Sequence, residues 1–309
     1  MQAIRQQRLG GTEVLELVEV PTPAPIPTEV LVKVHAAGVN PVDWKSRAGN
    51  GMPLDLPFTL GWDVSGVVEE LGFATSIFAV GDEVLGMPWF PRAANAYAEY
   101  VTAPARQFVR KPAKLSHVEA AGLPLAGLTA WQALVDVADV QPGQRVLVTA
   151  AAGGVGHLAV QIAKARGAYV LGTARAAKHE FLRSLGVDEP IDYTTVDVPA
   201  TVREVDVVLD LVGGQQSVDL VGTLARGGLI IPVPGGVSEE LAKAAAEHGA
   251  RTSPILVEPD HAGLQALVDL VEADLLRVVV EQSFPLADAA KAHEVGEAGR
   301  VVGKLVLTV

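Results

Sequence analysis

The stretch that decides the fold runs from residue 145 to residue 168 and reads RVLVTAAAGGVGHLAVQIAKARGA. An apolar run at 146–148 gives way to small residues, and apolar side chains then recur every three or four residues from 155 to 163. This spacing places them on one face of a helix. Gly167 stands where a glycine commonly follows a helix. The stretch therefore predicts a strand, a tight turn of small residues and a helix.

The turn carries the pattern Ala151-x-Gly153-x-x-Gly156, a dinucleotide-binding fingerprint with alanine in place of its first glycine. Small residues let the backbone approach a pyrophosphate, and the free N–H groups that open the helix point at the phosphates. The alternative is an ordinary tight turn, but the strand before and the helix after favour nucleotide binding. We expect the cofactor to contact Ala151, Gly153, Gly154, Val155 and Gly156.

Length and composition narrow the class of protein. The 309 residues correspond to two domains at about 100–200 residues each. A net charge of -12 argues against nucleic acid or an anionic membrane as the main partner. No apolar run approaches the roughly 20 residues that span a bilayer, and the opening MQAIRQQRLGG lacks the apolar core of a secretory signal. The absence of cysteine excludes disulfides and thiolate catalysis and fits the cytoplasm, where we expect the protein.

Two patterns of secondary structure divide the chain. Short strands with glycine turns, at 30–35, 63–71, 83–86, 97–102 and 108–111, predict a barrel-like β domain. Further on, apolar strands alternate with helices, which is typical of a doubly wound parallel sheet. The strands of this second pattern are expected at 146–149, 169–173, 206–211, 229–233 and 252–257.

The tail after Pro259 predicts helices at 264–275 and 287–297 and a strand at 303–308. It is too short to fold alone, so we expect it to return to the first domain. The predicted domains are 1–117 with 260–309, and 118–259.

Several segments together resemble the medium-chain dehydrogenase/reductase superfamily, and within it the zinc-free quinone and enone oxidoreductases. They are GVNPVDWKSRAG at 38–49, LGWDVSGVV at 60–68, VGDEVLG at 80–86, GLTAWQAL at 127–134, the opening stretch, and GKLVL at 303–307. The resemblance covers nearly the whole chain. It implies an α/β protein with a GroES-like β-barrel domain and a Rossmann dinucleotide-binding domain.

The zinc-dependent branch of that superfamily has cysteine where Asn40 stands and histidine where Trp62 stands. Asparagine and tryptophan do not supply a zinc site. Without a Lewis acid, an alcohol is harder to polarise for oxidation. We therefore predict no metal site, and an enzyme that transfers hydride from NADPH to a quinone or to the C=C bond of an α,β-unsaturated carbonyl.

The residues after the strand at 169–173 indicate which nicotinamide is bound. A free ribose 2′-OH usually meets an acidic residue about 20 residues past the glycine turn. No carboxylate ends this strand, which instead offers Thr173, Arg175 and Lys178. Two cations and a hydroxyl suit a 2′-phosphate, although the cations could also be solvated surface groups. Tyr193 matches a tyrosine that touches this phosphate in the family, so we expect NADPH.

The resemblance implies further contacts to the cofactor. Asn40 and Thr129 lie near the nicotinamide in the family. Val212 and Gly235 follow predicted strands at the edge of the sheet where doubly wound folds bind ligands. Lys304 belongs to a C-terminal segment that closes over the cofactor.

No proton donor stands out in the sequence. Asp43 and Lys45 flank the expected cleft and, with Asn40, are the candidate catalytic residues; Tyr97 is a further candidate. Bulk water is an alternative, and each side chain could instead have a structural or solvent-facing role. Trp62, like Trp44, either lines a substrate pocket or belongs to the core.

Other functions stay open at this point. A zinc-free carbonyl reductase would yield an alcohol instead of a saturated ketone. A protein that binds NADPH without turnover, as a redox sensor, is also compatible with the sequence. The expected partners are a small quinone or enone and a second copy of the chain, because edge strands such as the one at 229–233 often pair across a dimer in this family.

Overall fold

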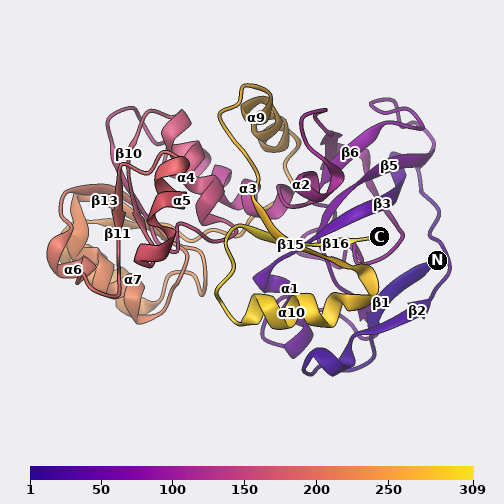
Figure 1. The fold of residues 1–309 in the computed structure, drawn as a ribbon, viewed down its shortest axis with the longest axis horizontal. Coiled ribbons are helices and arrows are strands. Elements are labelled where there is room, and N and C mark those ends of the chain that lie inside the picture. Colours follow the sequence, from indigo (N-terminus) through magenta and orange to yellow (C-terminus); the bar gives the residue numbers. More distant parts are fainter. The chain divides into compact units, whose positions relative to one another are not determined.

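The computed structural model describes residues 1–309. Contacts within the chain divide it into two compact units, one of Met1–Leu128 with Glu258–Val309 and one of Thr129–Val257. Residues 118–128, which the sequence-based division assigns to the Rossmann domain, group with the first unit, because helix α2 (His117–Ala121) packs on strands β3 and β5. Figure 1 shows the elements of each unit in the colours of the sequence.

The first unit contains two sheets. A three-stranded sheet has the order β2-β1-β4, and a larger one has the order β15-β16-β3-β5-β6-β8, with β7 also paired to β3. The strands are β1 (Gln2–Gln6), β2 (Glu16–Glu19), β3 (Glu29–Val39), β4 (Phe58–Thr59), β5 (Asp63–Leu71), β6 (Glu83–Gly86), β7 (Tyr100–Pro104), β8 (Phe108–Arg110), β15 (Val280–Pro285) and β16 (Lys304–Thr308). The helices are α1 (Pro41–Ala48), α2, α9 (His261–Glu272) and α10 (Ala289–Glu297).

The last strand of the chain completes the larger sheet. Strand β16 pairs antiparallel with β3, so that Leu305 lies opposite Val39 and Leu307 opposite Ala37. Both leucines join a buried cluster with the valines of β3 and β5. This pairing brings Lys304 next to Val39, the last residue of β3, and to Asn40, which follows it.

The second unit is a six-stranded parallel sheet of order β11-β10-β9-β12-β13-β14. Its strands are β9 (Arg145–Val148), β10 (Tyr169–Thr173), β11 (Glu189–Ile191), β12 (Val205–Asp210), β13 (Leu224–Pro232) and β14 (Arg251–Thr252). Its helices are α4 (Gly156–Ala165), α5 (His179–Ser184), α6 (Val198–Thr201), α7 (Gln215–Leu220) and α8 (Glu239–His248), and α3 (Pro124–Trp131) crosses the boundary at residue 128. The order reverses direction at β9, which confirms the predicted doubly wound sheet.

One predicted strand is largely wrong. The apolar run at 252–257 suggested a full strand, but β14 ends at Thr252. Pro254 lacks the N–H that a ladder requires, so the pairing stops there. No helix in the structure combines the length and the apolar character that crossing a membrane requires.

Candidate functional site

The turn between β9 and α4 packs tightly against the first residue of the helix. A Cβ built on Gly156 would lie 2.4 Å from the carbonyl oxygen of Ala150 and 2.8 Å from the Cα of Ala151. The backbone therefore occupies the place of a side chain. Ala151, which replaces the first glycine of the fingerprint, is fully buried. Its methyl group has room because β10 carries Gly172 opposite, where a Cβ would come within 3.0 Å of it.

A buried histidine, which the sequence analysis did not single out, braces the same turn. The Nδ1 atom of His157 lies 2.9 Å from the carbonyl oxygen of Gly153, and the backbone N–H of His157 donates to the same oxygen at 3.0 Å. The imidazole is fully buried. The first turn of α4 thus holds Gly153 in place, with the N-terminal end of the helix directed at the turn.

Arg175 and Tyr193 meet beyond the end of β10, where Arg175 Nε donates to the tyrosine hydroxyl at 3.3 Å. Tyr193 is 51% exposed. The buried hydroxyl of Thr173 accepts the N–H of Ala150 at 3.2 Å and so holds the turn, and its predicted contact to the cofactor stays a prediction. Lys178 ends the short 3-10 helix that follows Arg175.

A carboxylate that the sequence analysis missed also lies at this end of the sheet. Asp192 follows β11 and accepts the N–H of Ala176 at 3.2 Å. Its hydrogen bonds from Thr194 hold the pKa of the carboxyl group below its usual value. Asp192 follows β11, the strand beside β10. The sequence analysis looked for an acidic residue only at the end of β10 and therefore did not find it. Its charge also acts on Arg175.

Thr149 and Asp210 join β9 and β12 at the point where the strand order reverses. The threonine hydroxyl donates to Asp210 Oδ1 at 2.7 Å and accepts the N–H of Leu211 at 2.7 Å. The buried carboxylate also accepts from Val212, Gly213 and Ser217. Ligands of doubly wound sheets bind at this switch point. In the sequence, the only sign of this buried carboxylate was that Asp210 ends an apolar strand.

The loops that follow β12 and β13 lie against each other, because a Cβ on Gly213 would come 2.6 Å from the carbonyl oxygen of Pro234. These loops carry two of the predicted cofactor contacts, Val212, which is half exposed, and Gly235, at φ +80°. Thr129 is buried within α3.

In the first unit, Asn40 is the residue around which a buried polar cluster forms. It precedes α1, and its backbone N–H donates to Asp43 Oδ2 at 2.7 Å. Its side-chain Nδ2 donates to Asp63 Oδ2 at 2.8 Å, and its Oδ1 accepts from the Lys304 ammonium group. Asp63 also accepts the N–H of Leu125 at 2.6 Å. The neighbours therefore determine which way the Asn40 amide faces.

Lys304 lies inside this cluster and is 2% exposed. Its Nζ atom donates to the Val39 carbonyl at 3.2 Å and lies 3.6 Å from Asp63 Oδ2. Burial lowers the pKa of the ammonium group, and the two aspartates act in the opposite direction. The structure thus places the lysine on Asn40 and Asp63, whereas its predicted contact to the cofactor stays a prediction.

Asp43 is a second perturbed carboxyl group of the cluster. Burial raises its pKa to about 7, the hydrogen bond from Asn40 opposes this, and the charge of Asp63 adds to it. Its other oxygen accepts the N–H of Gly61 at 3.1 Å. Lys45, the third candidate catalytic residue, is exposed on α1 and does not join the cluster.

Trp62 belongs to the interior, and the partly buried Trp44 packs against the core. Trp62 is fully buried, donates its indole N–H to the Arg92 carbonyl at 2.6 Å and contacts Phe90 edge to face. Trp44 packs edge-on against His293. No group of three or more histidine, cysteine, aspartate or glutamate side chains is arranged to hold a metal ion.

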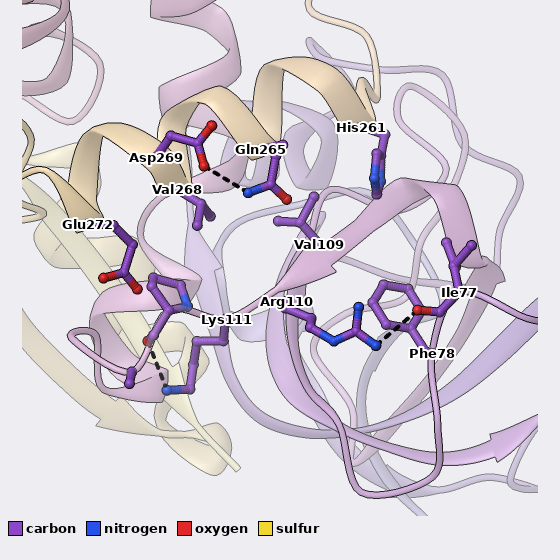
Figure 2. A pocket seen from close by; sticks show the side chains of 12 residues that line it. Ile77, Phe78, Val109, Arg110, Lys111, His261, Gln265, Val268, Asp269 and Glu272 are labelled. Atoms are coloured by element: carbon purple, nitrogen blue, oxygen red, sulfur yellow. Dashed lines mark hydrogen bonds between the residues drawn. The ribbon is translucent and has the colours of Figure 1, made fainter.

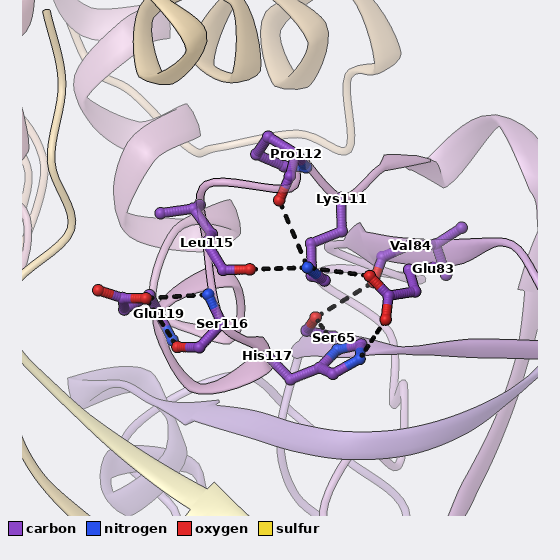
Figure 3. A network of polar contacts seen from close by, with 9 residues as sticks. All are labelled: Ser65, Glu83, Val84, Lys111, Pro112, Leu115, Ser116, His117 and Glu119. Atoms are coloured by element: carbon purple, nitrogen blue, oxygen red, sulfur yellow. Dashed lines mark hydrogen bonds and ion pairs between the residues drawn. The ribbon is translucent and has the colours of Figure 1, made fainter. Parts of the chain in front are cut away.

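A pocket beside α9 and a row of polar side chains on the first unit are weaker candidates for an active site than the Asn40 cluster. Figure 2 shows a pocket of about 420 Å³ beside α9, in which Arg110 donates to the Ile77 carbonyl and Lys111 to the Pro112 carbonyl. Figure 3 shows Ser65, His117 and Glu83 in a row, with 2.8 Å between the serine hydroxyl and the imidazole. Ser65 is fully buried, so its hydroxyl cannot act as a nucleophile on a substrate.

Comparisons with known proteins agree with this architecture. Residues 26–113 match the alcohol dehydrogenase GroES-like domain, and residues 185–307 match the zinc-binding dehydrogenase family. The chain is 34% identical to the chloroplast envelope quinone oxidoreductase homolog of Arabidopsis thaliana, over 96% of this chain and 95% of the relative.

Solved structures give the same result. The quinone oxidoreductase from Coxiella burnetii superposes with a TM-score of 0.94 at 41% identity, covering 100% of this chain and 99% of that one. The Escherichia coli quinone oxidoreductase complexed with NADPH has a TM-score of 0.90 at 28% identity and full coverage of both chains, 100% each. The chain therefore belongs to the medium-chain dehydrogenase/reductase superfamily, among oxidoreductases of the quinone oxidoreductase type.

Proposed function

We propose that this protein is a zinc-independent, NADPH-dependent enzyme that reduces a quinone or the C=C bond of an α,β-unsaturated carbonyl. The observation that carries the proposal is the Asn40 amide, held between the Lys304 ammonium group and the Asp63 carboxylate. The zinc-dependent branch of the family has a metal-binding cysteine at this position. Here a fixed hydrogen-bonding group takes its place.

The Asn40 amide can stabilise negative charge on a substrate oxygen. Its oxygen accepts from an ammonium group, which polarises the amide and makes its remaining N–H a stronger donor. A preorganised donor of this kind acts on the oxyanion that develops as an enone or quinone is reduced. Loss of one such donor typically costs about 10²–10³ in kcat.

The second unit has the features that NADPH requires, and bound nicotinamide would supply the hydride. The N–H groups of the turn would bind the pyrophosphate, because a Cβ on Gly153 would meet only the Ala150 carbonyl oxygen within 4 Å and the backbone there is open to a ligand. Arg175, Lys178 and Tyr193 would hold the 2′-phosphate. In the proposal Ala151, Gly153, Gly154, Val155, Thr129, Val212, Gly235 and Lys304 complete the contacts, while Thr173 supports the turn.

Replacing both Arg175 and Lys178 by alanine is expected to lower kcat/KM for NADPH by roughly 100-fold or more and to leave that for NADH nearly unchanged. Charge-assisted hydrogen bonds to the phosphate are worth about 1.5–3 kcal/mol each. Steady-state kinetics with both cofactors measures the change. The exposed Arg183→Ala variant on α5 is the matched control. An unaltered preference between the cofactors would reject the assignment.

The reaction itself is tested by following NADPH oxidation with a panel of quinones, enones and enals and identifying each product. A saturated ketone or a hydroquinone supports the proposal, whereas an alcohol from the same enone indicates the carbonyl reductase alternative. Binding of NADPH without turnover of any member would favour a redox-sensing role. Zinc bound stoichiometrically by the purified protein would contradict the proposed mechanism.

The proposal includes a homodimer and a cytoplasmic location. The homodimer rests on the family resemblance, and light scattering of the purified protein tests it directly. The location rests on the composition and is tested by fractionating the source cells.

A further inference from the structure

A chain of buried polar groups leads from Asp43 to helix α10. Hydrogen bonding from the Tyr97 hydroxyl lowers the pKa of the Asp43 carboxyl group, and the same hydroxyl lies 3.2 Å from Nε2 of His293. The Nδ1 atom of His293 lies 3.0 Å from a guanidinium nitrogen of Arg47, which also donates to Glu297 at 2.8 Å. Tyr97 and His293 are fully buried, and Arg47 is nearly so.

The chemistry of these groups allows only one direction for the hydrogen bonds. Arginine can only donate, so Nδ1 of His293 must accept and its Nε2 must carry the proton. Nε2–H then donates to the oxygen of Tyr97, and the phenolic proton is left for the Asp43 carboxylate. Burial, with the charge of Arg47, lowers the pKa of His293 to about 3, which keeps the ring neutral. Because Arg47 does not release a proton, the chain orients donors and does not relay protons.

We propose that Tyr97 and His293 are positioning residues that keep the Asp43 carboxyl group charged and thereby hold Asn40 in its working orientation. The hydrogen bonds that join Tyr97, His293 and Arg47 rest on measured distances. Their consequence for turnover rests on the function proposed above, in which the Asn40 amide faces the substrate oxygen.

The surroundings of Asp43 explain why such a chain is needed. Asp63 on β5 repels its charge, and Lys304 on β16 attracts both carboxylates. Arg47 lies on the same helix as Asp43, whereas His293 comes from α10. Asp43 and Asp63 share the single buried ammonium group of Lys304, so two negative charges are balanced by one positive charge. The Tyr97 hydroxyl opposes the effect of burial on Asp43, and His293 strengthens that donor by binding its oxygen.

The direct test is ¹³C NMR of protein labelled at its aspartate carboxyl carbons, with the Asp43 signal assigned through its loss in Asp43→Asn. In Tyr97→Phe, the titration midpoint of that signal is expected to move upward by about one pH unit, the equivalent of one hydrogen bond. His293→Leu is expected to give a smaller upward shift, and His293→Gln, which restores an N–H donor, to reverse part of it. Tyr100→Phe, on β7, is the matched control and should leave the midpoint in place.

The second readout is the pH dependence of kcat. If turnover needs charged Asp43, kcat falls as the pH drops through its pKa, so the fall should begin at higher pH in Tyr97→Phe while KM for NADPH stays unchanged. Variants that lose stability without moving the NMR midpoint would overturn the proposal, as would an unchanged midpoint in folded Tyr97→Phe. A wild-type protein that reduces none of the panel refutes the proposed function, whereas the NMR titration judges the hydrogen-bond chain separately.

Discussion

Replacing Lys304 by methionine is expected to lower the free energy of unfolding by about 3–5 kcal/mol, the usual cost of removing one partner of a buried ion pair. Methionine fills a similar volume but leaves the Asp63 carboxylate without its counter-charge and Asn40 Oδ1 without its donor. Chemical denaturation followed by tryptophan fluorescence measures the loss. Trp44, Trp62 and Trp89 lie in the first unit, so the fluorescence signal reports on the region that contains Lys304.

Two companion variants make this result specific. Lys243→Met removes an exposed lysine whose nearest carboxylate, on Glu247, is 4.0 Å away, and should change stability by less than about 0.5 kcal/mol. Adding Asp63→Asn to Lys304→Met removes the orphaned charge and should recover part of the loss. Equal destabilisation by the buried and the exposed lysine substitutions would contradict the expected role of the ion pair.

The loss in Lys304→Met should also depend on pH. Burial already raises the pKa of Asp43 and of Asp63, and removal of the ammonium group raises both further. A carboxyl group whose pKa is raised in the folded state takes up protons on folding, so stability falls as the pH rises from about 4 through the folded pKa. The difference from wild type should be largest at neutral pH and shrink toward pH 4. A pH-independent difference would show that lost packing, not charge, causes the effect.

Substituting Gly156 by alanine is expected to weaken NADPH binding by roughly 100-fold or more. The new Cβ would lie 2.4 Å from the Ala150 carbonyl oxygen and 2.8 Å from the Ala151 Cα, and both are backbone atoms that cannot rotate away. The turn must shift, and the N–H groups that we expect to bind the pyrophosphate shift with it. Loss of two charge-assisted hydrogen bonds, at about 1.5–3 kcal/mol each, gives this magnitude.

Titration calorimetry with NADPH measures the affinity, and circular dichroism without cofactor checks that the variant is folded. Gly222→Ala is the matched control in the same unit, because the nearest atom to its added Cβ is 4.0 Å away. That variant should bind like the wild type. If Gly156→Ala bound NADPH within a few-fold of the wild type, the turn would not be the pyrophosphate site.

The fold could be predicted from the sequence because strands and helices leave hydrophobic patterns among neighbouring residues. The change of hydrophobic period around residues 145–168 marks a strand and a helix, and apolar runs such as VDVVLDLV mark strands buried on both faces. Where that local evidence is weak, prediction failed. Strand β15 is mostly exposed and shows no apolar pattern, so it was missed, and the run at 252–257 is apolar without forming a strand beyond Thr252.

For the candidate site, the sequence by itself predicted the glycine turn and the cations after β10, and it named Asn40 and Asp43 as candidate residues. Only the tertiary structure decided that Lys304 contacts Asn40, which is 264 positions away in the chain. It also decided that Tyr97, bound to His293, acts on the Asp43 carboxyl group. The physical reason is that a turn or a helix face depends on neighbouring residues. A buried ion pair or hydrogen-bond chain depends instead on which strands pair, and here the pairing of β16 with β3 places the ammonium group against the amide.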